Sequence, residues 1–100
     1  MEKETLIAVK DFCFYHELKF SFIENLDAYG LIAIQTVGES SYISEADLPT
    51  LERYVSFYRH LDINFEGMEA ITYLLERIDA LQSEITTLKN KIRFYENKPE

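Results

Sequence analysis

The feature that most constrains this chain is an unbroken apolar repeat in its last third. Apolar residues recur there at alternating steps of three and four, at Ile71, Leu74, Ile78, Leu81, Ile85, Leu88, Ile92 and Tyr95. This is the heptad of a coiled coil, with Ile at every a position and Leu at every d position until Tyr95. A helix of about 25 residues spans about 38 Å, longer than the rest of so small a domain can cover. The repeat therefore predicts a dimerisation helix over residues 64–96, most simply in a homodimer; packing of this stripe on the chain's own domain is the alternative.

The charges beside the repeat bear on how two such helices would pair. In a parallel pair, g-to-e′ contacts join Glu84 to Lys89 and Lys91 to Glu96, and both contacts are attractive. Ile at a with Leu at d also favours two parallel strands.

The rest of the chain has the composition of one small domain. The chain has 100 residues, of which 47% are hydrophobic, enough to form a core. No apolar run approaches the roughly 20 residues of a membrane span, and the start of the chain does not resemble a signal peptide. Cys13 is the single cysteine, which fits a reducing compartment. We therefore expect a cytoplasmic protein without a membrane partner.

Before the repeat, the sequence predicts a winged helix-turn-helix over residues 1–63, and it predicts a short tail over residues 97–100. Residues 5–9 suit a strand, residues 10–18 and 19–29 suit two helices, and Gly30 ends the second helix. Residues 31–43 alternate like a hairpin or wing with its turn at Gly38. Ser44 is expected to start a third helix, with an inward face at Leu48, Leu51, Val55, Tyr58 and Leu61. Asn64 is expected to cap the last helix, and Gly67 to be approached closely by the first or second helix.

Charge argues against nucleic acid as the main partner. The formal net charge is −8, and residues 20–52 contain no Lys or Arg. Duplex binding depends on phosphate neutralisation by these residues, so the charge distribution disfavours DNA as a partner. An acidic partner-binding surface is the hypothesis, formed by Glu24, Asp27, Glu39, Glu52 and Asp62, with Phe14, Phe20 and Phe57 as candidate apolar anchors. The alternative is that these acids form an ordinary solvated surface.

The sequence offers no constellation for catalysis. Cys13 and His16 have a spacing seen in metal sites, but zinc needs about four ligands and His60 is distant in sequence. Neither a nucleophile with a paired base nor a Gly-rich phosphate loop is evident. We predict a protein that is not an enzyme and has no metal, cofactor or catalytic residue.

The order strand, helix, turn, helix, wing, helix and long helix resembles that of MerR-type winged-helix proteins. At finer grain, "DFC" (residues 11–13), "YGLI" (29–32) and "LDINFEGMEAITYLLERIDAL" (61–81) are similar to segments of the CbpM-type chaperone modulators, a MerR-like branch. This resemblance implies binding to the J-domain of a DnaJ- or CbpA-like co-chaperone, which blocks its stimulation of Hsp70. J-domains carry a basic second helix, so an acidic helix-turn-helix could occupy that surface.

The chain also departs from the MerR pattern. MerR regulators place an Arg-Tyr-Tyr-Glu-like motif in the second helix, where this chain has Glu24, Asn25, Leu26 and Asp27, and the wing at residues 40–43 lacks their basic residue. MerR-type dimers usually pair their long helices antiparallel, so the resemblance and the heptad disagree on orientation. The other functions that stay open are a DNA-binding transcriptional regulator, whose basic set would be Lys3, Lys10, Lys19, Arg53 and Arg59, and a dimeric interaction scaffold.

Overall fold

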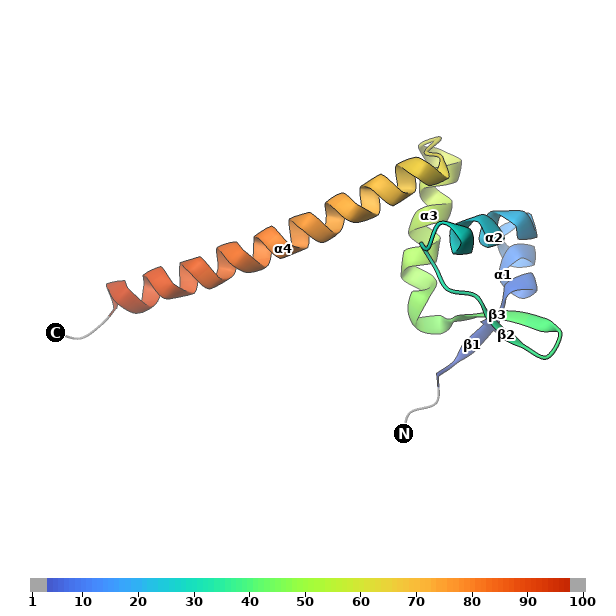
Figure 1. Cartoon of the computed structure of the whole chain (residues 1–100), viewed down its shortest axis with the longest axis horizontal. Coiled ribbons are helices and arrows are strands. Elements are labelled where there is room, and N and C mark those ends of the chain that lie inside the picture. Colours follow the sequence, from blue (N-terminus) through green and yellow to red (C-terminus); the bar gives the residue numbers. More distant parts are fainter. Residues whose placement is uncertain (1–3, 98–100) are drawn as a thin grey trace. The chain divides into compact units, whose positions relative to one another are not determined.

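The structure is a computed structural model that describes residues 4–97. Its elements are β1 (Leu6–Ala8), α1 (Val9–His16), α2 (Phe20–Ala28), β2 (Gln35–Val37), β3 (Ser40–Ser44), the 3₁₀ helix η1 (Glu45–Asp47), α3 (Leu48–His60) and α4 (Phe65–Glu96). The chain divides into two compact units, of which the first ends at Glu69 and the second begins at Ala70. The first unit holds all the elements before α4, together with the first turn of α4 (Figure 1).

The three strands form an antiparallel sheet in the order β1-β3-β2. Leu6 pairs with Ser44 in one ladder, and Val37 pairs with Ser40 in the other. Gly38 takes the first position of the two-residue turn between β2 and β3 with φ +65°, a conformation that glycine adopts without steric cost. The predicted wing and its turn are therefore present.

The two helices of the helix-turn-helix end in the same way. At the end of α2, the amide of Gly30 donates to the carbonyl of Asp27 and that of Leu31 donates to Leu26, with Gly30 at φ +73°. At the end of α1, Glu17 takes the equivalent left-handed position at φ 55°. Both ends are Schellman motifs, which satisfy the last carbonyls of the helices. The prediction that Gly30 ends the second helix is confirmed.

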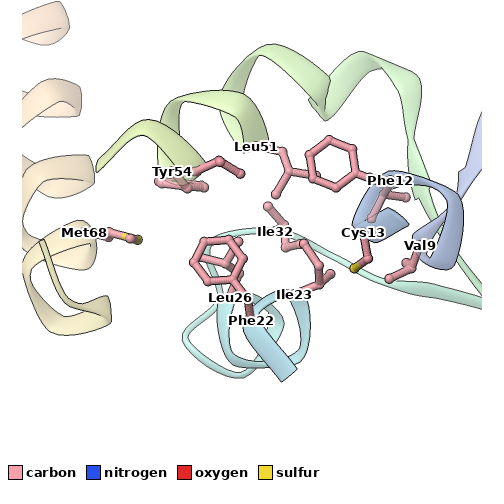
Figure 2. Packing of buried hydrophobic residues seen from close by; sticks show 12 residues of the cluster. Val9, Phe12, Cys13, Phe22, Ile23, Leu26, Ile32, Leu51, Tyr54 and Met68 are labelled. Carbon is pink, nitrogen blue, oxygen red and sulfur yellow. The ribbon is translucent and has the colours of Figure 1, made fainter. Parts of the chain in front are cut away.

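The core of the first unit lies between its helices and one face of the sheet. Val9, Phe12 and Cys13 come from α1, and further buried side chains meet them from α2, α3 and the first turn of α4: Phe22, Ile23, Leu26, Leu51, Tyr54, Val55 and Met68 (Figure 2). The buried residues of α2 and α3 recur at steps of three and four, which is the spacing that the sequence predicts for helices facing a core.

One predicted boundary is wrong and another is correct only in part, because Ser44 caps a helical turn as predicted but that turn is the 3₁₀ helix η1. Residues 31–34 are not part of a strand, because Ile32 leaves the wing and packs into the core while the amide of Ile34 donates to the carboxylate of Asp27. Ser44 is the last residue of β3, and its hydroxyl caps η1 by accepting from the amide of Ala46. The third α-helix begins only at Leu48.

The inward face predicted for the third helix is only partly correct. Leu51 and Val55 are buried, but Tyr58 is 48% exposed and Leu61 is 61% exposed. Leu61 lies beyond the end of α3, where Asp62 turns the chain at φ 56° and the amide of Ile63 bonds back to the carbonyl of Phe57. Tyr54 takes the buried place instead, at 3% exposure.

The start of α4 is fixed by the predicted cap. The side-chain oxygen of Asn64 accepts from the amide of Gly67 at 2.8 Å, which satisfies one of the free amides of the first turn. A Cβ on Gly67 would lie 2.8 Å from the Ile63 methyl Cγ2 and 3.0 Å from the Asn64 oxygen Oδ1. The predicted close approach at Gly67 is thus real, but the neighbours are the capping residues of α4 itself and not the first or second helix.

The substitution Gly67→Ala is therefore expected to lower the free energy of unfolding by about 1 kcal/mol. Alanine is favoured over glycine in helix interiors by a similar amount, but here the added methyl both displaces the Asn64 cap and overlaps the Ile63 methyl, and these two costs together exceed the gain. Urea unfolding followed by circular dichroism measures this, with Asn64→Ala as the variant that removes the cap alone. In the Asn64→Ala background the loss should shrink; stabilisation by Gly67→Ala in the wild-type background would contradict the clash.

The second unit consists of the remainder of α4, which Figure 1 shows as one uninterrupted helix. We call the eight residues of the heptad repeat the seam. Seven seam side chains are 48–70% exposed: Leu74, Ile78, Leu81, Ile85, Leu88, Ile92 and Tyr95. The eighth, Ile71, is half-buried. A continuous apolar stripe is thus open to solvent in the single chain. Of the predicted tail, residues 98–100 lie outside the described residues.

No helix within the described residues is long and apolar enough to cross a membrane.

Candidate functional site

The outward face of α2 is where a helix-turn-helix protein would read DNA. The buried side of α2 is formed by Phe22, Ile23 and Leu26, which leaves Phe20 and Glu24 on the exposed side, one helical turn apart. Glu24, and Asp27 one turn further on, are exposed, and no Lys or Arg lies within α2. This face presents negative charge and an aromatic ring where phosphate contacts would need positive charge.

Asp27 also has a structural role. One oxygen of its carboxylate accepts from the backbone amide of Ile34 at 3.2 Å, which holds the loop between α2 and β2. A substitution at Asp27 therefore changes folding as well as surface charge. Glu24, by contrast, is exposed and free to serve as a probe of binding.

The turn of the wing brings Glu39 towards the two helices. Glu39 lines a hollow of about 460 Å³ together with Lys10 of α1, Phe20 of α2 and residues 40–42 of β3. Phe20, which lies on the outward face of α2, is thus a lining residue of the same hollow as Glu39. Lys10 also lines the hollow, which therefore carries charges of both signs, whereas the charged residues of α2 are all acidic.

Exposed aromatic rings surround this region. Phe14 is 88% exposed and Phe20 is 42% exposed, as expected for apolar anchors on a binding surface. Phe14 follows Lys10 by one turn of α1 and therefore shares its face. Phe57 is not available as an anchor, because it is half-buried against the core and forms an edge-to-face contact with Tyr54.

Tyr15, which the apolar pattern of residues 10–18 places on the inward side, is 81% exposed. That inward assignment is wrong: Tyr15 lies two residues after the buried Cys13, on nearly the opposite side of α1. Its ring packs edge-on against His16, with the ring centroids 5.1 Å apart.

The remaining two residues of the predicted acidic surface lie on other elements. Glu52 is exposed on α3, beside Arg53, and Asp62 follows the end of α3. Asp62 takes the left-handed conformation that ends the helix, which Asp tolerates better than most residues. Glu24 and Asp27 thus share a face of α2 with Phe20, Glu39 lines a hollow with Phe20, and Asp62 has a role in the turn.

The basic residues that a DNA-binding function would use are scattered or engaged. Arg59 donates from its guanidinium to the backbone carbonyls of His16 and Glu17, the latter at 2.8 Å, and so ties α3 to the turn of the helix-turn-helix. Lys10 lies on α1, Lys19 lies in the turn before α2 and Arg53 lies on α3, and all three are exposed. Lys3 lies outside the described residues.

A hydrogen bond joins the end of α2 to the start of α4 within the first unit. The Tyr29 hydroxyl donates to a carboxylate oxygen of Glu66 at 2.6 Å, and the Tyr29 ring stacks on Phe65 with centroids 5.6 Å apart. This bond lowers the pKa of Glu66 and raises the pKa of Tyr29. The Glu66 pKa is lower in the folded state than in the unfolded chain. The ionised carboxylate therefore stabilises the folded state at pH values above the ordinary pKa of 4.5, and this stabilisation is lost as the pH falls through the lowered pKa.

We therefore expect Tyr29→Phe to lower the free energy of unfolding at pH 6, and the difference from wild type to shrink by pH 3. The raised pKa of Tyr29 places the other limit on the alkaline side, since the bond weakens once the hydroxyl ionises above its ordinary value of 10. Urea unfolding of both proteins at pH 6 and pH 3 measures the effect. If the difference in the free energy of unfolding between the two proteins is the same at pH 6 and pH 3, the stabilisation does not depend on the ionised Glu66 carboxylate.

The described residues also bear on the chemistry that the site could perform. Within residues 4–97, no three His, Cys, Asp or Glu side chains are placed so that they could hold a metal ion. Cys13 is buried, and burial raises the pKa of its thiol, which disfavours the reactive thiolate. The arrangement suits recognition of another molecule by charge and aromatic contact.

Taken together, two helices joined by a tight turn, a two-stranded wing and a following helix define a winged helix-turn-helix protein. The family model described as "MerR HTH family regulatory protein" matches residues 7–90, and the chain belongs to this family. No curated protein and no solved structure gives a significant match to the chain.

Proposed function

We propose that this MerR-family protein is a chaperone modulator, which binds the J-domain of a DnaJ- or CbpA-like co-chaperone and inhibits it. The observation that carries the proposal is the outward face of α2, which holds Phe20, Glu24 and Asp27 and lacks a basic residue. The resemblance of residues 11–13, 29–32 and 61–81 to CbpM-type modulators supplies the identity of the partner. We further propose that the protein acts in the cytoplasm by binding alone, without catalysis, metal or cofactor.

The proposed binding combines charge with apolar contact. The acids around α2 and the wing would attract the basic second helix of the J-domain and compete with its docking on Hsp70. Complementary charge mainly sets the rate of encounter and the choice of partner, so affinity requires apolar contacts as well. Phe20, which lines the same hollow as Lys10 and Glu39, and the exposed ring of Phe14, one turn after Lys10 on α1, are the proposed sources of these contacts.

Calorimetric titration of the full chain with the J-domain of a DnaJ-like protein from the same organism tests the proposal, with duplex DNA as the control ligand. Micromolar or tighter binding to the J-domain, without binding to the duplex, is the expected result. Absence of J-domain binding would refute the chaperone function and leave the fold assignment intact, because fold and function separate at the site.

A DNA-binding regulator is the second candidate, since the family match includes regulatory helix-turn-helix proteins. It would show affinity for duplex DNA that falls steeply with salt, because each phosphate neutralised releases counterions. The described basic residues give little support to that role. Arg59 is hydrogen-bonded to backbone carbonyls, and the other three do not lie on a common element: Lys10, Lys19 and Arg53.

We also propose that the protein is a homodimer through the seam of α4. The exposure of Ile78, Leu81 and Ile85 at 48–50% leaves apolar area that a second helix would cover. If J-domain and DNA binding both fail while the dimer persists, a dimeric interaction scaffold is the function that remains.

A further inference from the structure

We propose that a hollow beside α2 binds an acidic segment of the J-domain partner, while the outward face of α2 binds the partner's basic helix. The inference rests on the proposed function and deepens it by a second contact site of opposite charge. The hollow lies within the first unit and is lined by the turn before α2, by α2, by α3 and by Phe65 at the start of α4. Its volume is about 320 Å³, close to the lower limit of roughly 300 Å³ for ligand sites. It therefore has room for one or two side chains of a partner, and we call it the basic hollow.

Three aromatic rings line the basic hollow and pack on one another. Phe22 of α2 is buried, and its ring centroid lies 4.8 Å from that of Tyr58 on α3 and 5.6 Å from that of Phe65. Tyr58 nevertheless remains 48% exposed, although the sequence predicts that it faces inward. A ring that is held by its neighbours and still partly exposed offers apolar area that a partner's side chain would bury.

Two cationic side chains, Lys19 and Arg59, line the same hollow. The Arg59 nitrogen Nη2 donates to the backbone carbonyls of His16 and Glu17, which fixes the guanidinium in place. Within residues 4–97 the structure gives Nη1 and Nε no such bond, so their N–H groups remain available to a carboxylate. Glu17 is the acidic residue of the lining. The basic hollow thus carries more positive than negative charge, whereas the whole chain carries a net charge of −8.

The basic hollow borders the outward face of α2. Ser21 and Asn25 line it from α2, one helical turn apart, and both are exposed. Glu24 lies one turn after Ser21, so the acidic centre of the face and the edge of the hollow are neighbours on the helix surface. Two neighbouring sites of opposite charge define the orientation of a partner, because a reversed partner would bring like charges together. The partner that fits carries a basic helix next to an acidic segment with an apolar side chain.

Reversal of the charge at Lys19 tests the proposal through the sign of the effect. An acidic protein attracts a basic partner more strongly when it loses a positive charge, so this general attraction alone would make Lys19→Glu bind the J-domain more tightly. If an acidic group of the partner docks in the basic hollow, the same substitution replaces an attraction by a repulsion. We expect it to weaken J-domain binding about tenfold.

Arg53→Glu is the matched control. It makes the same change in charge at an exposed position of α3 that does not line the hollow, and it should leave the affinity unchanged or slightly higher. Calorimetric titration at one salt concentration gives the affinities, and circular dichroism confirms that both variants are folded. An affinity of Lys19→Glu that equals or exceeds that of the wild-type protein would overturn the proposal.

Exchange of charges between the two proteins provides a second readout. Each Asp and Glu of the J-domain is replaced in turn by lysine and titrated against the wild-type protein and against Lys19→Glu. At least one of these J-domain variants is expected to bind the wild-type protein weakly and to regain affinity for Lys19→Glu, because the contact is then attractive with its signs exchanged. If no J-domain variant regains affinity, the contact with Lys19 is refuted.

The outcomes distinguish this proposal from the proposed function. A wild-type protein that binds no J-domain refutes both. Wild-type binding that Lys19→Glu leaves unchanged or strengthens refutes the basic hollow alone. Binding to duplex DNA that Lys19→Glu abolishes, with J-domain binding unchanged, would overturn the proposal and assign the hollow to a phosphate group.

Discussion

Replacing both Ile78 and Ile85 with aspartate is expected to convert the protein from a dimer to a monomer. Both residues occupy a positions at the centre of the seam, and both are about half exposed in the single chain, at 48% and 50%. A dimer would bury four carboxylates in its apolar interface, and an unpaired buried charge costs several kcal/mol even after relaxation. We therefore expect the dimer dissociation constant to rise by at least a thousandfold.

Light scattering at micromolar concentration measures the change as a halving of the mass. Ser83→Asp with Asn90→Asp is the matched control, because it adds the same charge on the outer face of α4, where both side chains are exposed. The core of the first unit takes no side chain from positions 78 and 85, so its cooperative unfolding should persist in the monomer. An unchanged mass for the Ile78 and Ile85 variant would exclude the seam as the dimer interface.

Charge reversal on the acidic surface is expected to weaken J-domain binding by roughly ten- to a hundredfold when Glu24, Glu39 and Glu52 are changed together to lysine. Each reversal removes an attraction and adds a repulsion, and exposed charges contribute up to about 1 kcal/mol each. The three side chains are exposed, and the structure gives them no hydrogen bond that their loss would break. The free energy of unfolding should therefore change little.

Asp27 requires a separate variant because its carboxylate holds the amide of Ile34. Asp27→Asn removes the charge and keeps an acceptor oxygen, so a loss of affinity in that variant reports on charge. Glu76→Lys on α4 is the control for a charge reversal outside the acidic surface, and it is compared with each of the three single reversals. Calorimetry at low and high salt completes the test, since the difference between wild type and the triple variant should narrow as salt screens it. An affinity that is unaltered by the triple reversal would remove the acidic surface from the proposed function.

Only the charge of the proposed binding surface was predictable from the sequence. The sequence shows that residues 20–52 contain no Lys or Arg. Since α2 lies within this range, its outward face also lacks basic residues. The sequence did not show that Glu39 lines a hollow together with Phe20 and Lys10, because this depends on how the wing folds relative to α1 and α2. For the same reason the sequence did not show that Phe57 is packed against Tyr54 while Tyr15 is exposed.

The sequence by itself determined the elements whose signals are local and repeated. The heptad of α4, the Asn64 cap, Gly30 at the end of α2 and Gly38 in the wing each depend on neighbours within a few residues, so the chain specifies them wherever it lies. Only the tertiary structure determined the burial of residues whose local sequence pattern is compatible with more than one environment. The pattern around Ile32 predicts a strand residue, but Ile32 is buried in the core. The pattern around Leu61 predicts an inward helix residue, but Leu61 is exposed. The neighbours of Gly67 are Ile63 and the capping residue Asn64, and not another helix. The reason is that the free energy gained by burying an apolar side chain depends on which residues from other elements pack against it, and the local sequence does not contain this information.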